Sequence, residues 1–476
     1  MTTIDAQRLA DFCHGVRFDA LPDDVQTMAR TLLVDTLGCL VGGLQYPEVQ
    51  RLGRRLGGRQ ADGFTAVPFT RLLTWGAAAT WLDADSGGSF HPRGDRMPPV
   101  PTAHPAPHVV PVLLHHAASD SPSDADLLTA FVAAIEIGMR FGVGSSLRPG
   151  FHPHGVHGPV AAAVAQALLT GMDRQATANA ILLGLSQPLA ATLMVPMRGG
   201  TVRNVWTGLG TFLGAQAAQR AASGAVGEAG TAHVLFDAAI CTDLDLTVVE
   251  GGLGTRWHFL DSYLKPYACG RWIHPTLDAF TAAVVGSGRH CANLDTEIAA
   301  IDVSTFAFAA SLDTHHVDSD MHARFSVPTC LAALAVHGQL VADTFLPERL
   351  PDPRVEAVAS RVSVVEDPAF TAVLPAERPA SVTVTWRDGS SSTGSVRNAR
   401  GNPQEPLSLD EVEHKFRQNV GTAIDASQAI DLLHGRDQLR TSGRLSHIAA
   451  RLVASASDPH DDQEAESPLR PPRPPH

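Results

Sequence analysis

The sequence changes character at Tyr263-Leu264-Lys265-Pro266-Tyr267-Ala268-Cys269-Gly270-Arg271-Trp272-Ile273-His274, its densest run of polar and aromatic residues. The run contains one of the only two lysines, Lys265 and Lys415, among 36 lysine and arginine residues. Lysine offers a compact charge with a movable pKa, which a guanidinium cannot supply. We therefore interpret the run as part of an anion-binding active site. The alternative is a hinge between domains, with packed aromatic rings and with Lys265 and Arg271 facing water.

Upstream of this run, residues 1–262 predict a large helical domain. Pro22 with Asp23 and Asp24 has the composition of a first helical turn, and apolar residues then recur at three-to-four spacing as far as Gly42-Gly43. Similar patterns, rich in alanine and glycine, cover residues 125–138, 159–171, 176–193 and 206–222. Their many small residues favour closely packed helices.

Downstream, residues 263–405 predict an α+β domain. Residues 297–309, 355–365 and 381–386 favour strands, and Arg387-Asp388-Gly389 is a turn signal before a return strand at 395–397. A helix start at Ser408 opens a helical return to the first domain over residues 406–455, and residues 456–476 have the composition of a disordered tail. The predicted fold class is mainly α with a second α+β domain that contains an antiparallel sheet.

Composition excludes several classes of protein. The net charge of −13 and the lack of a basic stripe argue against a nucleic-acid surface. The six cysteines form no CxxC pair, which indicates reduced thiols rather than a disulfide frame or a zinc ribbon. The sequence shows no signal peptide, and no apolar run suggests a membrane span. We expect a cytoplasmic protein that binds neither nucleic acid nor membrane.

Two segments combine titratable groups with loops. Asp83-Ala84-Asp85 precedes a proline-rich loop that ends at His104-Pro105-Ala106-Pro107-His108, so an acidic residue there can orient an imidazole or act as a base. Gly150-Phe151-His152-Pro153-His154-Gly155-Val156-His157 precedes a helix, whose N-terminus favours an anion. Its HxHxxH spacing also suits a metal, but no nearby carboxylate completes a ligand set. A solvated loop and structural histidines are the alternatives.

A third segment, Arg198-Gly199-Gly200-Thr201-Val202-Arg203, places two arginines around a glycine pair at the start of a helix. Guanidinium groups in this position suit bidentate binding of carboxylates. The glycine pair lacks the spacing and the lysine of a phosphate loop. A surface turn is the alternative.

Taken in order, these segments resemble the MmgE/PrpD family. The matching stretches are Val34-Asp35-Thr36-Leu37-Gly38-Cys39, Leu82-Asp83-Ala84-Asp85, His104-Pro105 with Val110-Pro111, Gly150-Phe151-His152-Pro153, Lys265-Pro266-Tyr267 with His274, Ala323-Arg324-Phe325-Ser326-Val327-Pro328, and Gly401-Asn402-Pro403 through Lys415-Phe416. They are collinear from residue 5 to about residue 450. The collinear set is more specific than any single motif.

The resemblance implies a helical domain plus a lid-like α+β domain, a homodimer, a site between the domains and no obligatory cofactor or metal. It carries over Asp83, His104, His152, Lys265 and His274 as catalytic residues. The sequence departs from the family pattern in three places. Gly87 replaces a threonine, Arg203 replaces a helix-opening lysine, and Thr329 replaces an aromatic hydroxyl. A second His-Pro pair, His91-Pro92, leaves open which histidine, His91 or His104, belongs to the site.

The chemistry implied by the resemblance develops carbanion character beside a carboxylate. We expect Arg203 and Lys265, helped by Arg271 and Tyr267, to bind the carboxylates of a small polycarboxylate and to stabilise that charge. His152 and His104 are the candidate base and acid, in an order that stays open, and Asp83 is expected to orient one imidazole.

The expected activity is that of a cofactor-independent lyase, most simply one that dehydrates a 2-methylcitrate-like hydroxy acid. Two alternatives stay open within the enzyme class: a decarboxylase of a cis-aconitate-like acid, and an isomerase or epimerase of a related acid. A non-catalytic relative that binds an acidic metabolite is the alternative from another class.

Overall fold

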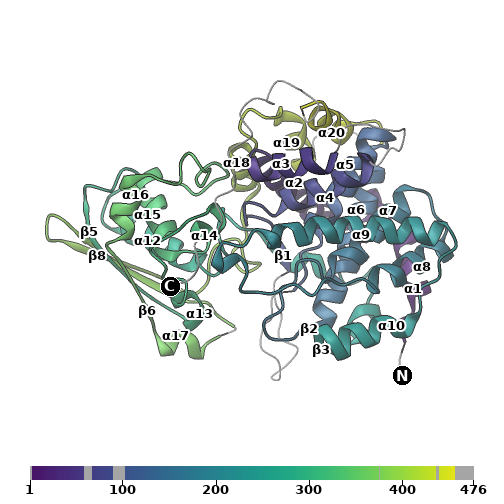
Figure 1. Ribbon diagram of the computed structural model, residues 1–476, viewed down its shortest axis with the longest axis horizontal. Helices are drawn as coiled ribbons and strands as arrows, with labels where there is room; N and C mark the ends of the chain where they lie inside the picture. The colour runs from purple at the N-terminus through teal and green to yellow at the C-terminus, as the bar shows by residue number, and fades with distance from the viewer. Residues whose placement is uncertain (1–2, 58–66, 89–101, 375, 436–438, 456–476) are drawn as a thin grey trace.

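The computed structural model describes residues 3–57, 67–88, 102–374, 376–435 and 439–455, which form two lobes side by side (Figure 1). The helical lobe contains α1 (Ala6–Gly15), α2 (Asp23–Gly43), α3 (Pro47–Gly57), α4 (Val67–Ala79), α5 (Ala106–Ser119), α6 (Asp124–Gly144), α7 (Gly158–Leu169), α8 (Arg174–Leu185), α9 (Val202–Ala222), α10 (Ala229–His233) and α11 (Leu246–Glu250). Its short strands pair as β1 (Gly87–Gly88) with β4 (Ser262–Tyr263), and as β2 (Ser145–Leu147) with β3 (Cys241–Leu244).

The α+β lobe is built on a four-stranded sheet with the order β6-β5-β7-β8. The strands are β5 (Ile298–Thr305), β6 (Val362–Glu366), β7 (Ala380–Trp386) and β8 (Ser391–Val396). β5 pairs parallel to β6 and antiparallel to β7, which pairs antiparallel to β8. The helices of this lobe are α12 (His274–Gly286), α13 (Ala307–Ala310), α14 (Asp320–Arg324), α15 (Val327–His337), α16 (Pro353–Ala359) and α17 (Pro368–Ala372). The fold is thus mainly α with a smaller α+β part, which confirms the predicted class.

Each lobe has its own hydrophobic core. The core of the α+β lobe forms where α12 packs against β7 and β8, and the buried side chains of β7 alternate along the strand at Val382, Val384 and Trp386. The core of the helical lobe is built from the N-terminal helices together with residues of the C-terminal segment such as Phe416 and Leu433. The chain therefore leaves the helical lobe, forms the second lobe and returns.

The return is made by α18 (Leu409–Val420), α19 (Ser427–Leu433) and α20 (Arg444–Ser455), which lie against the N-terminal helices (Figure 1). α18 and α19 pack on α2, and α20 packs on α5. α18 begins with a capping box, in which the Ser408 hydroxyl accepts from the Glu411 N–H and the Glu411 carboxylate accepts from the Ser408 N–H. The predicted helix start at Ser408 is therefore confirmed.

Glycines let α9 approach its neighbours closely. A Cβ on Gly208 would lie 2.1 Å from the Leu73 carbonyl oxygen of α4, and a Cβ on Gly214 would lie 2.3 Å from the Pro159 carbonyl oxygen of α7. No larger residue fits at either position without moving backbone. This packing holds the first turn of α9, which carries Arg203, against the loop that follows α4.

Three predicted elements differ from the structure. The strand predicted over residues 297–309 ends at Thr305, and α13 follows from Ala307. Residues 355–365 are not one strand, because Pro353 at the first helical position and the Asp352 side chain, which accepts from the Arg354 N–H, start α16 before β6 begins. The helix predicted over residues 176–193 ends at Leu185, ahead of Pro188, which has no N–H to continue it.

α6 corrects the expectation that no segment has membrane-spanning length. Its 21 residues are long and apolar enough to cross a membrane, but 89% of its apolar window is buried inside the fold. Its buried charges, Glu136 and Arg140, pair with each other at 2.7 Å. These features are those of a core helix.

All six cysteines are free in the described part of the chain. The predicted tail at 456–476 and the His91-Pro92 pair lie outside the described residues.

Candidate active site

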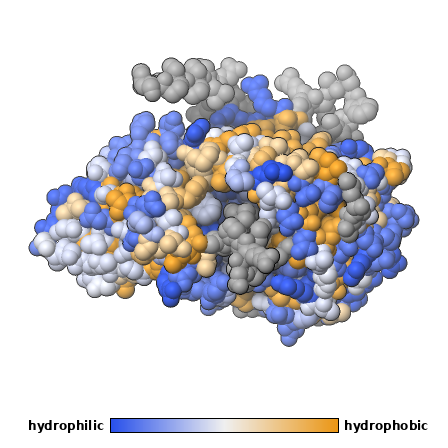
Figure 2. Space-filling model, turned by 90° about the horizontal axis from the view of Figure 1, so that it is seen from below, coloured by the Kyte–Doolittle hydropathy of each residue, from blue (hydrophilic) through white to orange (hydrophobic). Residues whose placement is uncertain are grey.

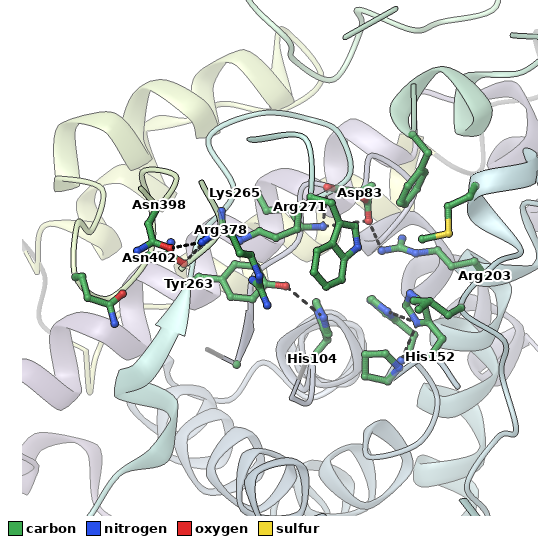
Figure 3. Close-up of a pocket in the computed structure, with 18 of the residues that line it drawn as sticks. Asp83, His104, His152, Arg203, Tyr263, Lys265, Arg271, Arg378, Asn398 and Asn402 are labelled. Atoms are coloured by element: carbon green, nitrogen blue, oxygen red, sulfur yellow. Dashed lines mark hydrogen bonds and ion pairs between the residues drawn. The ribbon is translucent and has the colours of Figure 1, made fainter. Parts of the chain in front are cut away.

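A pocket opens where the two lobes meet, and the surface is hollowed there on the face seen in Figure 2. Both lobes contribute to it, so segments far apart in the sequence converge on one space (Figure 3). The lining residues are Asp83, Gly88, His104, His152, Pro153, His154, Leu193, Met197, Arg203, Tyr263, Lys265, Arg271, Trp272, Phe325, Ala376, Arg378, Asn398, Asn402 and Gln404. Cationic, imidazole and amide groups thus face a common cavity.

Asp83 connects two cations at the base of the pocket. The Lys265 ammonium donates to the Asp83 carbonyl oxygen at 2.8 Å and to its Oδ1 at 3.0 Å, and the Arg203 guanidinium donates to the same Oδ1. The backbone of Asp83 is left-handed, with φ +50°, a conformation that aspartate tolerates better than most residues. Asp83 therefore positions Lys265 and Arg203 and, contrary to expectation, contacts no imidazole among the described residues.

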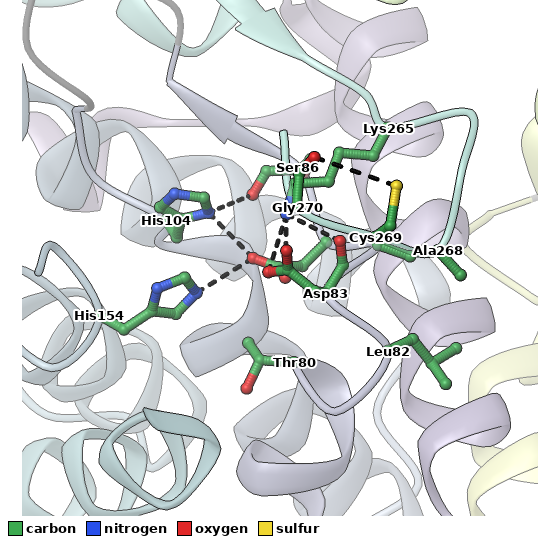
Figure 4. Close-up of polar contacts among 12 residues, drawn as sticks. Thr80, Leu82, Asp83, Ser86, His104, His154, Lys265, Ala268, Cys269 and Gly270 are labelled. Carbon is green, nitrogen blue, oxygen red and sulfur yellow. Dashed lines mark hydrogen bonds and ion pairs between the residues drawn. The ribbon is translucent and has the colours of Figure 1, made fainter. Parts of the chain in front are cut away.

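The carboxylate that orients the imidazoles is Asp85. Its Oδ2 lies 2.9 Å from Nδ1 of His104 and 3.1 Å from Nε2 of His154. Figure 4 labels these two imidazoles, which lie next to each other. The Ser86 carbonyl oxygen also accepts from Nδ1 of His104, at 2.9 Å, so this nitrogen carries the proton and Nε2 is left for the pocket. The sequence predicted that an acidic residue of this segment orients an imidazole, but the residue expected was Asp83 rather than Asp85.

His154 links Asp85 to His152. Nδ1 of His154 lies 3.0 Å from Nδ1 of His152, which accepts from the His154 backbone N–H at 3.2 Å, so Asp85, His154 and His152 stand in a row of contacts that ends at the pocket. Burial, followed by the Arg203 charge, holds the pKa of both histidines well below its ordinary value. Both rings are therefore neutral near pH 7, and His152 is able to accept a proton. His154 was not among the predicted site residues.

Charges inside the pocket stabilise each other. Burial opposes the charge on Lys265, but Asp83 and Asp85 outweigh it and raise the pKa of the ammonium. Burial likewise works against an ionised Asp85, but Lys265 and the two imidazoles outweigh it and hold the pKa of Asp85 well below its ordinary value. Lys265 is thus cationic and Asp85 anionic at neutral pH.

Arg271 presents unused hydrogen-bond donors. Its Nη2 donates to Asn402 Oδ1, whereas its buried Nε and Nη1 have no hydrogen-bond partner among the described residues. Its guanidinium lies over the Tyr263 ring at 4.4 Å, and burial lowers its pKa to about 10, which leaves it charged. A buried cation with open donors is a site for a carboxylate. Arg378, which sequence reasoning missed, lines the same wall and lies 4.8 Å from the Trp272 ring.

Three other residues of interest are not among the lining residues. Nε2 of His274 donates to the Cys269 carbonyl oxygen at 3.1 Å, and the Tyr267 hydroxyl donates to Asp278 at 2.8 Å. His274 opens α12 and its ring packs edge-on against Tyr267, so both belong to the packing of that helix. Thr329 lies in the first turn of α15, where its hydroxyl accepts from Ser326.

The histidine cluster at 152–157 does not converge on a metal site. His157 instead hydrogen-bonds Ser145 Oγ through Nε2 at 3.0 Å. In the described part of the chain, one group brings three potential ligand atoms within 4.8 Å, namely Asp85, His104 and His154. Its atoms already hydrogen-bond each other, and Arg203 and Lys265 lie 3.5 and 3.9 Å from Asp85 Oδ1. Two fixed cations at this distance disfavour a divalent ion.

The buried histidines predict loss of stability in mild acid. Burial lowers the pKa of five of them: His108 and His157, both to about 3, and His152, His154 and His274. Below pH 6.5 the unfolded chain binds protons that the folded chain does not, so each such histidine costs roughly 1.4 kcal/mol of unfolding free energy per pH unit. Glu136 acts in the opposite direction. Burial raises its pKa to about 7, so in mild acid the folded chain binds one proton there that the unfolded chain does not.

We therefore expect the melting temperature to fall between pH 7 and pH 5 in thermal unfolding. His157→Asn, which keeps a partner for Ser145 but cannot titrate, is expected to give a shallower pH dependence by about one proton. A melting temperature that is constant over this range contradicts the neutral state of these histidines.

Comparison with known proteins agrees with the collinear motifs. Residues 7–237 match the MmgE/PrpD N-terminal domain and residues 267–436 match the MmgE/PrpD C-terminal domain. The chain is 24% identical over 474 residues to a cis-aconitate decarboxylase of Aspergillus terreus, which covers 90% of this chain and 93% of that protein. It is 23% identical to the cis-aconitate decarboxylase-like protein oryM of Aspergillus oryzae, over 94% of this chain and 98% of that protein. The two domain matches together span most of the sequence, and the chain belongs to the MmgE/PrpD family.

Proposed function

We propose that this protein is a lyase that acts on a small polycarboxylic acid, and that it removes CO₂ from an unsaturated tricarboxylate of the cis-aconitate type. The observation that carries the proposal is the charge balance of the pocket. Four cationic side chains line it, Arg203, Lys265, Arg271 and Arg378, whereas Asp83 and Asp85 supply two negative charges. A polyanion restores this balance.

The two halves of the pocket suggest different roles. In the helical half, Lys265 and Arg203 are held at fixed positions by Asp83. In the α+β half, Arg271 has open donors and lies beside Arg378 and the amide of Asn402. We assign the binding of a remote carboxylate to Arg271 and Arg378. Lys265 and Arg203 face the reacting end, where negative charge develops.

The chemistry follows from this arrangement. When the bond between carbon and carboxylate breaks, CO₂ leaves and the electron pair stays on carbon, delocalised toward a neighbouring carboxylate. Preorganised cations stabilise this charge without reorganising, and loss of one such donor typically costs about 10²–10³ in rate. The carbon then takes a proton from a donor beside His104, because Asp85 fixes the Nδ1–H of this imidazole and leaves Nε2 as an acceptor toward the pocket. The names of the relatives favour decarboxylation over the dehydration first expected from sequence.

Dehydration stays the second candidate because of one observation. Asp85 holds two imidazole arms, one ending at His104 and the other at His152, and both reach the pocket. An elimination of water uses one group to take the α-proton and another to protonate the departing hydroxyl. A decarboxylase needs only one of these arms.

Product analysis separates the two candidates. Purified protein is incubated in D₂O with cis-aconitate, citrate or 2-methylcitrate, and products are followed by NMR while CO₂ release is measured. The proposal expects CO₂ from cis-aconitate and one deuterium on the product carbon. Elimination of water from a hydroxy acid without CO₂ supports the second candidate. Absence of turnover on every compound contradicts the lyase assignment.

Arg271→Met is expected to raise KM by about 10–100-fold, because a hydrogen bond to a charged group is worth roughly 1.5–3 kcal/mol. The value of kcat is expected to change much less, since Arg271 is assigned to the remote carboxylate. Steady-state kinetics on the active substrate measures both. Arg289→Met is the matched control, because Arg289 stacks on Trp386 on the exposed side of the same lobe. An unchanged KM in Arg271→Met contradicts the assigned role.

A further inference from the structure

A hydroxyl group inside the pocket is not accounted for by the residues expected from the family pattern. The Tyr263 hydroxyl lies 3.5 Å from Nε2 of His104, and the two rings meet edge-on with centroids 6.1 Å apart (Figure 3). Tyr263 is buried, lines the pocket and immediately precedes the segment that carries Lys265.

The structure also gives a reason for the glycine at position 87. β1 pairs with β4 so that Gly87 lies opposite Tyr263. A Cβ on Gly87 would lie 2.7 Å from the Tyr263 hydroxyl and 2.5 Å from Cε1 of His104. No side chain fits there while the tyrosine and the imidazole keep their places. The phenol therefore occupies space next to His104 that a threonine side chain at position 87 would need.

Both nitrogens of His104 are engaged. Nδ1 contacts Asp85 and the Ser86 carbonyl oxygen, and Nε2 faces the Tyr263 hydroxyl. Asp85, His104 and Tyr263 thus form a chain of three titratable groups. Its outer member is the phenol, which has the Arg271 guanidinium on its ring face.

We propose that Tyr263 is the catalytic acid of this site and delivers the proton to the substrate carbon. The inference rests on the proposed lyase function. In the decarboxylation, the carbon–carboxylate bond breaks and CO₂ departs with the electron pair left on carbon. The Tyr263 O–H bond then breaks as the new C–H bond forms. The phenolate is then reprotonated by water, and the restored hydroxyl again faces Nε2 of His104.

The environment suits this role. Burial raises the pKa of Tyr263, while Lys265 and Arg271 act in the opposite direction. The phenol is therefore protonated at neutral pH before the reaction, and the Lys265 ammonium stabilises the phenolate that forms during it.

Tyr263→Phe removes only the hydroxyl and keeps the ring that packs under Arg271. The expected result is a fall in kcat of about 10²–10⁴-fold. Affinity for propane-1,2,3-tricarboxylate is expected to stay within about threefold. This probe binds without reacting, because it has no hydroxyl that could leave and no double bond that could accept the electron pair. Tyr267→Phe is the matched control, because its hydroxyl bonds Asp278 outside the pocket. A kcat of Tyr263→Phe within about threefold of the parent overturns the proposal.

A measurement independent of turnover tests whether Tyr263 touches the ligand. The chain has three tyrosines, Tyr46, Tyr263 and Tyr267, so ¹³C labelling at the phenolic carbon gives three NMR signals, and the one lost in Tyr263→Phe is that of Tyr263. Addition of propane-1,2,3-tricarboxylate is expected to shift this signal, and its failure to move while the ligand binds overturns the proposal. Inactivity of the parent protein on every acid contradicts the proposed function itself, and the contact is then judged from this spectrum.

Discussion

Asp85→Asn is expected to lower kcat by about 10³-fold while leaving the protein folded, because general acid–base groups typically contribute about 10²–10⁴-fold. The carboxylate accepts from both imidazole arms through Oδ2, and its Oδ1 lies 3.5 Å from Arg203 and 3.9 Å from Lys265. An amide cannot accept from the imidazoles and also face the cations favourably. If the amide oxygen faces the imidazoles, the NH₂ group faces the two cations. If the NH₂ group faces the imidazoles instead, the ring nitrogens must accept, which inverts their tautomers.

Asp278→Asn is the matched control for this change. Asp278 is also buried, and accepts from the Tyr267 hydroxyl at 2.8 Å and from the Arg400 N–H at 2.8 Å, but it does not line the pocket. Its amide variant is expected to lose stability and to keep kcat. Kinetics and thermal melting of both variants decide the point. Equal kcat values in the two variants would remove Asp85 from the mechanism.

Lys265→Met is expected to lower kcat by about 10²–10³-fold and to weaken binding of propane-1,2,3-tricarboxylate, because it removes a preorganised cation from the reacting end of the pocket. The variant is expected to stay folded. Asp83 keeps its ion pair with Arg203, so no buried carboxylate is left without a cation. Steady-state kinetics and titration calorimetry measure the two effects.

The other lysine of the chain provides the contrast. The Lys415 ammonium lies 2.5 Å from Asp35 Oδ1 and 2.8 Å from the Ala84 carbonyl oxygen, and Oδ2 of Asp35 has no partner among the described residues. Lys415→Met therefore leaves a buried carboxylate without a cation, which typically costs about 3–5 kcal/mol. We expect a lower melting temperature for Lys415→Met and lower turnover for Lys265→Met. The reverse pattern contradicts the roles given to the two lysines.

The helical half of the fold was predictable because its pattern is local. Apolar spacing and capping residues mark α2 and α18 in the sequence, and both helices begin close to the expected residues. The strand predicted over residues 355–365 is wrong for a local reason as well. The β-branched residues in this stretch favour a strand, but Asp352 and Pro353 start a helix. Here the helix-start signal outweighs the strand propensity of the residues that follow.

The sequence predicted which segments form the site, but it predicted only some of the residues that line it. Segments such as Asp83–Asp85, His152–His154 and the run from Lys265 to Arg271 do converge. Which member of each segment faces which partner depends on backbone geometry that spacing does not reveal. The left-handed turn at Asp83 directs that carboxylate to the cations and Asp85 to the imidazoles.

Arg378 and Tyr263 were missed for a different reason. Arg378 precedes β7 in the α+β lobe and belongs to no motif with recognisable chemistry, whereas Tyr263 opens the polar and aromatic run but received no role of its own. One signal was present in the sequence. Gly87 lacks the threonine hydroxyl of the family pattern and Thr329 lacks its aromatic hydroxyl, which is a reason to look for another phenol, and the chain has only three tyrosines.

A crystal structure of the protein with propane-1,2,3-tricarboxylate tests the central claim most directly, namely that cations from both lobes converge on one polyanion. The prediction is a ligand in the pocket between the lobes. One carboxylate is expected on Nε and Nη1 of Arg271, and another within hydrogen-bond distance of Lys265 or Arg203. A ligand that binds in solution but occupies another surface in the crystal, with no contact to these cations, contradicts the account.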